Sequence, residues 1–443
     1  MRKNYKKSFF ALVFVLAFFV PFYAEGEKYT LSADEAVEIA LKNNVSVKNS
    51  KISLEAAQRA KNHSWNSVSP TFSLGASGSV PVDGLTGGDQ TSNYSAAFGI
   101  SATVSLKFTA KLYTEMEGAK LSYEQSKISF DDVLRKIELS VRTAYYELIY
   151  NREYIELQEE NLKIAKTQYE NNLAKYNSGR LSEVDALSAE VNYKSKIPVV
   201  ESARTTFKNA MDSFKQVLGL MIDDEVELSG SLEDFLFLEE VKVEPENLQS
   251  STVRQLEIKL EETKNSVLEK RFSAFAPVLS ASFKWEDGKW YAAYDGSAPD
   301  PKKAASLTLS ASIPLDGILP WSSKNDAIDS ALDSVKKAEL DLDDGRKTFL
   351  RTVNSYLRSI AQSQEAVRYK QANVELARRT YEMTFESYNR GTKDLLTLQS
   401  ANNTLLSAQV TLNSEILTLA ENILSFEQAA GLEFGSLMSG SGN

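Results

Sequence analysis

Few residues of this chain have the chemistry of a catalytic or metal site. The sequence has one histidine, His63, and no cysteine, which excludes thiolate ligands and disulfides. The stretch "DLDDG" (341–345) begins like a calcium loop but lacks the glutamate that closes one. The stretch "GLTGGD" (84–89) lacks the Lys-Ser/Thr pair of a phosphate-binding loop. We therefore expect no catalytic residue, no metal and no cofactor, and we place His63 at a helix end.

Another group of polar residues lies in a motif that occurs twice. "YNSGRLSEVDAL" begins at Tyr176, and "YNRGTKDLLTL" begins 212 positions later at Tyr388. The glycine of each copy is expected to end a helix in a backbone conformation with positive φ, which glycine adopts at little cost. Ser182 with Asp185 has the spacing of a capping box, and Thr392 with Asp394 favours a new helix start. The turns are expected at Tyr176, Gly179, Gly391 and Thr392.

The repeated motif belongs to a repeat that spans most of the chain. The offset of 212 also relates Tyr169 to Tyr381 and Gly219 to Gly431. In each copy an apolar residue recurs every seven positions, which predicts helices wound into coiled coils. One such helix, 111–177, has a length of about 100 Å. The alternative is a globular bundle of independent amphipathic helices. The apolar positions are Val141, Leu148, Ile155, Leu162, Tyr169, Tyr176, Val353, Ile360, Val367, Val374, Tyr381 and Tyr388.

Four segments alternate apolar with small polar residues, as membrane-spanning β-strands do. A soluble β-sandwich alternates in the same way and remains the alternative. Four strands are too few to close a barrel, and an open edge in lipid is costly. Two chains give eight strands, with an interior filled by side chains, and three give twelve, which favours a lumen. The segments are 72–80, 94–108, 279–285 and 305–315.

The first 24 residues read as a secretory signal peptide, with a basic start, an apolar run and a small residue at Ala24. A retained membrane anchor is the alternative. Removing four cations and no anions takes the formal charge from −10 to −14, so nucleic acid is not an expected partner.

The chain therefore divides into a signal peptide, two structural repeats, an acidic connector and a flexible end. Each repeat is expected to contain a helix, a strand pair, a long helix, a turn and a further helix. The fold class is mixed α+β and mainly α, with an internal duplication. The ranges are 1–24, 25–220 (strand pair 70–108, turn 176–182), 221–246, 247–435 (strand pair 277–315, turn 388–394) and 436–443.

The duplicated unit, the opening "LSADEAVEIALKNN" and the paired turns together resemble the TolC family of outer-membrane efflux and secretion channels. The resemblance covers nearly the whole chain after the signal peptide. It implies a homotrimer with a twelve-stranded barrel in outer-membrane lipid and a long α-helical tunnel through the periplasm. It also implies a periplasmic adaptor and an inner-membrane transporter as partners, in a tripartite efflux pump or a type I secretion system. A structural tether or adhesin of the cell envelope is the alternative function.

The resemblance further implies a gate at the periplasmic helix tips. Tyr388 and Lys393 on the second tip take the places of residues that bond an aspartate on the first tip, here Asp185. Lysine lacks the bidentate geometry of the more typical arginine, so the latch should be weaker. Thr397 and Ser400 stand where well-known relatives have acidic rings. We therefore expect no carboxylate filter there, and selectivity to depend on diffuse negative charge.

Overall fold

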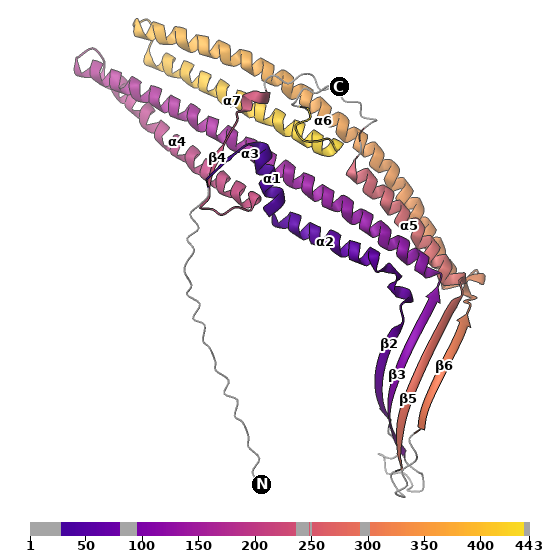
Figure 1. Cartoon of the computed structure of the whole chain (residues 1–443). Helices are drawn as coiled ribbons and strands as arrows, with labels where there is room; N and C mark the ends of the chain where they lie inside the picture. Colours follow the sequence, from indigo (N-terminus) through magenta and orange to yellow (C-terminus); the bar gives the residue numbers. More distant parts are fainter. Residues whose placement is uncertain (1–27, 80–94, 236–247, 249, 293–301, 438–443) are drawn as a thin grey trace, which may run out of the picture.

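The structure, a computed structural model, describes residues 28–79, 95–235, 248, 250–292 and 302–437. The helices form a long curved rod with a sheet at one end (Figure 1). The helices are α1 (Ala33–Asn43), α2 (Val45–Asn62), α3 (Lys111–Asn177), α4 (Glu183–Leu218), α5 (Ser251–Phe275), α6 (Ser323–Asn389) and α7 (Leu395–Ala430). The strands are β1 (Lys28–Leu31), β2 (Thr71–Ser79), β3 (Ser95–Thr109), β4 (Glu225–Leu228), β5 (Val278–Ala292) and β6 (Lys302–Ser312).

The two halves of the chain repeat one arrangement of helices. α3 and α6 have 67 residues each, and α4 and α7 have 36 each. Near the sheet, α2 lies along α3 and α5 lies along α6, while α4 and α7 cover the other ends of the two long helices (Figure 1). The prediction of two long helices, each accompanied by shorter ones placed end to end, is confirmed. We call α3/α4 the first coil and α6/α7 the second coil.

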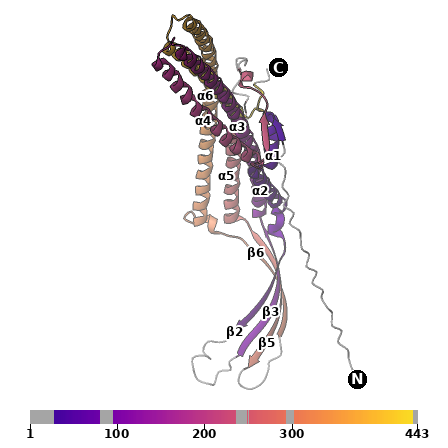
Figure 2. The ribbon, with the colours of Figure 1, turned by 90° about the vertical axis from the view of Figure 1, so that its left-hand side faces the viewer.

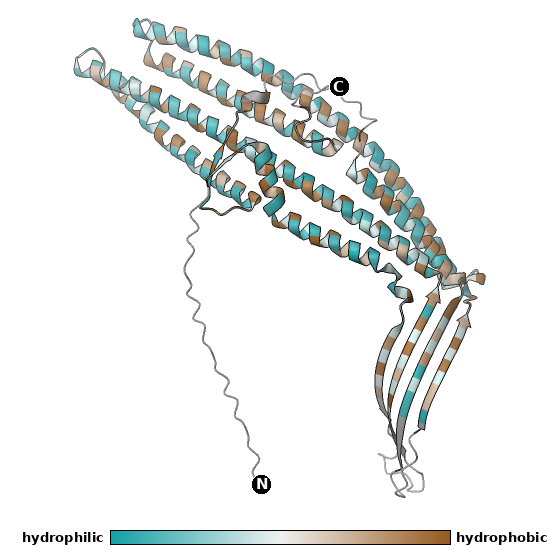
Figure 3. Ribbon diagram, viewed as in Figure 1, coloured by the Kyte–Doolittle hydropathy of each residue, from teal (hydrophilic) through white to brown (hydrophobic). Residues whose placement is uncertain are grey.

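The sheet has four antiparallel strands in the order β2-β3-β5-β6, so one hairpin comes from each repeat. Figure 2 shows it extending away from the helices, and Figure 3 shows hydrophobic and hydrophilic residues alternating along it. One face carries exposed apolar side chains, including Phe72, Leu74, Leu307 and Leu309. β5 continues to Ala292, past the predicted end at 285, because pairing with β3 continues through its charged residues.

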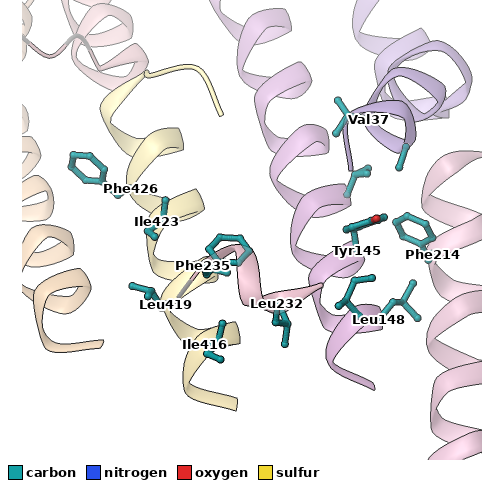
Figure 4. Close-up of a cluster of buried hydrophobic side chains, with 14 of the residues drawn as sticks. Val37, Tyr145, Leu148, Phe214, Leu232, Phe235, Ile416, Leu419, Ile423 and Phe426 are labelled. Atoms are coloured by element: carbon teal, nitrogen blue, oxygen red, sulfur yellow. The ribbon is translucent and has the colours of Figure 1, made fainter. Parts of the chain in front are cut away.

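The largest hydrophobic cluster lies halfway along the rod, where both coils meet (Figure 4). It joins Leu148 of α3 and Phe214 of α4 to Ile423 and Phe426 of α7, all at most 1 % exposed. Burying a large apolar side chain stabilises the fold by about 1.5–3 kcal/mol. This equatorial core is therefore the firmest connection between the first and the second coil.

The acidic connector contributes to the core, which its sequence did not reveal. β4 pairs in parallel with β1, and Arg152 donates hydrogen bonds to the carbonyls of Leu228 and Gly230 at 2.8 and 2.6 Å. A 3-10 helix, η3 (Leu232–Phe235), then places Leu232 and Phe235 between α3 and α7 (Figure 4). Strands of four residues have too short a pattern to be recognised in sequence.

Buried Glu427 holds the segment that follows α7. Its carboxylate accepts hydrogen bonds from the backbone N–H groups of Gly435 (3.0 Å) and Leu437 (3.1 Å). Burial raises the pKa of Glu427, and these hydrogen bonds and the charge of Arg142 oppose the rise. Of the segment expected to be flexible (436–443), Leu437 is thus bonded to the core, and 438–443 lie outside the described residues.

Several expectations fall wholly or partly outside the described residues. They are the signal peptide (1–24), the stretch "GLTGGD" (84–89) and much of the connector. The division into ranges stays a prediction. Among the described residues, no helix is long and apolar enough to cross a membrane.

Candidate functional site

The two repeated turns have the same backbone geometry. Gly179 has φ +71° and Gly391 has φ +76°, so both lie in the left-handed region. In the first turn the N–H of Gly179 donates to the carbonyl of Tyr176 at 2.8 Å, and the corresponding bond from Gly391 to Tyr388 is 2.9 Å. This pattern closes a helix C-terminus. Both turns therefore directly follow the C-termini of the long helices α3 and α6.

The next helix in each repeat begins with a side-chain cap. The Ser182 hydroxyl accepts from the N–H of Asp185 at 3.2 Å and donates to the Asp185 carboxylate at 2.6 Å. In the second repeat the Asp394 carboxylate accepts from the N–H of Thr397 at 2.7 Å. The Thr392 hydroxyl instead donates backwards, to the carbonyl of Ser387 at 3.0 Å.

Tyr388 links the two tips, but through a residue that the sequence reasoning missed. Its hydroxyl donates to the side-chain oxygen of Asn172 on α3 at 2.7 Å, and the Lys175 ammonium lies 5.1 Å from its ring centre. Burial raises the pKa of Tyr388, the Asn172 bond opposes the rise, and the charge of Asp185 adds to it. Within one chain the hydrogen bond of Tyr388 therefore goes to Asn172.

The other two expected gate residues are placed differently from each other. Asp185 lies half-buried at the start of α4, where its carboxylate is engaged by Ser182. Lys393 is exposed in the second turn. The pKa of neighbouring Asp394 is lowered, first by its hydrogen bonds to Thr397 and then by the charge of Lys393. Among the described residues of one chain, Tyr388 therefore bonds Asn172 and Asp185 bonds Ser182, and Lys393 forms no hydrogen bond or ion pair with either Tyr388 or Asp185.

A row of buried amide side chains leads from the tips toward the equator. Four polar side chains of α3 are at most 9 % exposed: Gln158, Asn161, Gln168 and Asn172. In three of them, and in Gln399 of α7, the side-chain nitrogen is buried and has no hydrogen-bond partner among the described residues. We call Gln158, Asn161, Gln168, Asn172, Gln399 and Asn402 the amide seam.

The amide seam lies between the two coils. Asn402 of α7 donates to the side-chain oxygen of Asn161 on α3 at 2.7 Å. Farther from the tips, Asn413 donates to Glu153 at 3.1 Å. Each net hydrogen bond of this kind contributes about 0.5–1.5 kcal/mol, whereas each buried amide donor left without a partner costs about 1–3 kcal/mol. The contact between coils near the tips is therefore polar and weakly stabilising.

Within each coil the contacts are apolar. Tyr169 and Tyr193 stack between α3 and α4, with ring centres 5.8 Å apart. In the second coil, Ile360 and Val367 of α6 and Leu398 of α7 are at most 4 % exposed. The predicted seven-residue apolar lines are thus fully buried near the equator. The sequence did not reveal that α3 has a second buried row of residues, the amides of the amide seam, of which Asn161 bonds α7.

His63 and the stretch 341–345, the other residues considered for a metal site, lie in or at the end of helices. His63 caps the C-terminus of α2, as expected. Asp341 to Gly345 lie within α6. In the part of the chain that the structure describes, no three His, Asp or Glu side chains are grouped to hold a metal ion.

The chain thus combines two long coils, paired tips and one β-hairpin from each repeat. The sequence profile described as "outer membrane efflux protein" matches residues 36–228 and 248–431. The chain belongs to the outer membrane efflux protein family. Members of this family are non-enzymatic transport channels of the outer membrane that reach into the periplasm. They form trimers and work with efflux-pump partners.

Solved structures of membrane channels share this fold. CusC superposes with a TM-score of 0.75 at 15% identity, over 90% of this chain and 92% of that one. The Campylobacter jejuni outer membrane channel CmeC gives 0.70 at 21% identity, with coverages of 92% and 87%. The open state of Neisseria gonorrhoeae MtrE gives 0.68 at 18% identity, with coverages of 90% and 89%. No curated protein sequence matches the chain.

Proposed function

We propose that three copies of this chain assemble into one continuous duct across the outer membrane and periplasm, and that the helix tips open and close it. The observation that carries the proposal is the four-stranded sheet, whose outer strands β2 and β6 each pair on one side only. One of its faces is apolar and exposed. In lipid such edges must be paired, and pairing β2 of one copy with β6 of the next closes a barrel.

The outer surfaces of the helices support the same arrangement. α4 exposes Val184, Leu187 and Val191, which are between 51% and 71% accessible. On the opposite side of the chain, α6 exposes Tyr369, Leu376 and Met383 at intervals of seven residues, between 63% and 68% accessible. Positions of this spacing form the seam of a coiled coil. We infer that the α4 stripe of one copy packs on the α6 stripe of the next, which continues the ring of helices below the barrel.

The gate in this proposal is the contact between the coils near the tips. Opening separates the second coil from the first along the amide seam, while the equatorial core stays packed. The amides that lose partners are then hydrated, so opening costs little. Within one chain, the contacts of Tyr388 with Asn172 and Lys175 stabilise the closed state. Asp185 and Lys393 complete the latch, the lysine reaching across between copies.

Partners supply the energy and the cargo. The duct has no chemistry of its own, so an inner-membrane transporter drives export and a periplasmic adaptor docks at the tips, in an efflux pump or a type I secretion system. The turns that carry Gly179 and Gly391 are the surface that such an adaptor meets first.

The test is the mass and the conductance of the purified protein. Light scattering in detergent should give a trimer, and planar bilayers should show small steps that grow several-fold in Asp185→Asn or Lys393→Gln. Val184→Asp, which places a charge in the proposed α4 stripe, should reduce the trimer fraction without changing the helix content. A stable monomer in detergent would contradict the proposal. A folded trimer that never conducts would favour the tether.

A further inference from the structure

The face of the sheet opposite the apolar one is lined by small hydroxyl side chains. Thr71 and Ser105 face each other on β2 and β3, with their side-chain oxygens 2.6 Å apart. Ser280 and Ser310 do the same on β5 and β6, also at 2.6 Å. In a closed barrel the apolar face meets lipid, so this hydroxyl face lines the lumen.

Three charged side chains lie on the hydroxyl face among residues 71–78, 99–109, 278–287 and 303–312. Two of them, Lys284 and Glu286, neutralise each other across 3.0 Å on β5. The third, Lys107, is the direct neighbour of Ser280 in the register between β3 and β5. Lys107 is exposed and forms no ion pair with any described residue. One chain therefore contributes one uncompensated positive charge to this part of the lumen surface.

We propose that Lys107 makes the end of the barrel lumen next to α3 favour anionic solutes, locally opposing the diffuse negative charge expected from the sequence. The inference rests on the proposed trimeric duct, in which three Lys107 ammonium groups form a ring at the end of the barrel next to α3. At about 10 Å in water, three such charges change the local ratio of anions to cations about twentyfold in roughly 0.01 M salt and about fourfold in roughly 0.1 M salt. The effect fades at physiological salt, where the screening length is about 8 Å.

The helix tips provide no opposing carboxylates on α7. From Leu395 to Ser414 this helix has no charged residue. The groove along it is lined by uncharged side chains, including Gln399, Asn403 and Thr411, and by Lys370. The ammonium of Lys370 is paired with Glu415 at 2.8 Å. The groove along α7 therefore provides no acidic ring that would offset the positive charge of Lys107 in the barrel.

The experiment is the chloride-to-potassium permeability ratio of single trimers in planar bilayers, from the reversal potential in a gradient of dilute KCl. We expect the ratio to fall about twofold in Lys107→Gln and further in Lys107→Glu. Glu286→Gln, which frees Lys284, should raise it. Lys303→Gln is the matched control, because Lys303 is in register with Asp287 on the apolar face, and the ratio should stay unchanged.

A second measurement is local to the barrel. Inorganic tripolyphosphate added from the side of the hairpin loops should block the current of the unchanged protein, and Lys107→Gln should weaken this block about twofold or more. If Lys107→Glu keeps both the permeability ratio and the block of the unchanged protein, the inference is wrong while the duct stands. If no variant conducts at all, the proposed duct itself fails and the inference falls with it.

Discussion

The same two coils meet in two regions with opposite chemistry. At the equator, the connector buries the large apolar side chains of Leu232 and Phe235 between α3 and α7. Near the tips, the contact between α3 and α7 consists of Asn161, Asn402 and other amides, several with unpaired nitrogens. Removing apolar surface from water drives the first contact, whereas water competes directly for the second. The difference teaches where the proposed opening can occur: the coils stay joined at the equator, where their contact is apolar, and separate near the tips, where it is polar.

The largest expected effect comes from removing a core side chain. Phe426→Ala should lower the free energy of unfolding by about 3–5 kcal/mol, because the ring is fully buried and leaves a cavity. Asn402→Ala, on the same helix, should lower it by about 1–3 kcal/mol, because it leaves the buried side-chain oxygen of Asn161 without its donor. Urea titrations of the two proteins in detergent measure both values. Equal losses would remove the distinction between the regions.

A smaller effect is expected at the turns. Gly391→Ala forces a side chain into the left-handed region and should cost about 1–2 kcal/mol, although the added carbon meets no atom within 4 Å. Gly179→Ala should cost the same, because the two turns share their geometry. Hydrogen exchange of the tip amides should accelerate in both variants, and unchanged exchange in either would show that its turn tolerates the residue.

The long helices and the turns could be predicted from the sequence, because a seven-residue period and a glycine at a helix end each have one simple physical reading. The strand pairs followed from alternation, although β5 continues to Ala292, past the predicted end at 285. The tip site was predicted only in part. Asn172 shares a seven-residue line with Gln158, but amides at buried positions look like surface residues when the neighbouring helix is unknown. β1 and β4 were missed for lack of length.

A still smaller change in stability is expected when the amide seam is made apolar. Replacing both Asn161 and Asn402 by leucine should leave the free energy of unfolding unchanged or raise it by up to about 1 kcal/mol, since no donor is left unpaired. The same protein should open less often in planar bilayers. More frequent opening would show that the amides hold the coils together rather than let them part.

The smallest effect is a change in pH dependence within the core. Burial raises the pKa of Glu427 above its ordinary value of 4.5. The folded chain then holds this proton more tightly than the unfolded chain, so its contribution to stability is complete below pH 4.5 and is lost as the pH rises through the raised value. Glu427→Gln should flatten this decline in urea titrations carried out at increasing pH from 4.5 upward. An unchanged slope would assign the pH dependence to other groups.

The separation of the coils can be tested directly, because the chain has no cysteine of its own. A variant with Asn161→Cys and Asn402→Cys, bridged by a short reducible bis-thiosulfonate reagent, joins the coils across the amide seam. The matched control, Tyr169→Cys with Tyr193→Cys, is bridged within the first coil. We predict that the seam bridge abolishes conductance steps until a reductant restores them, while the control bridge leaves them unchanged. Full conductance through the bridged seam would contradict the account.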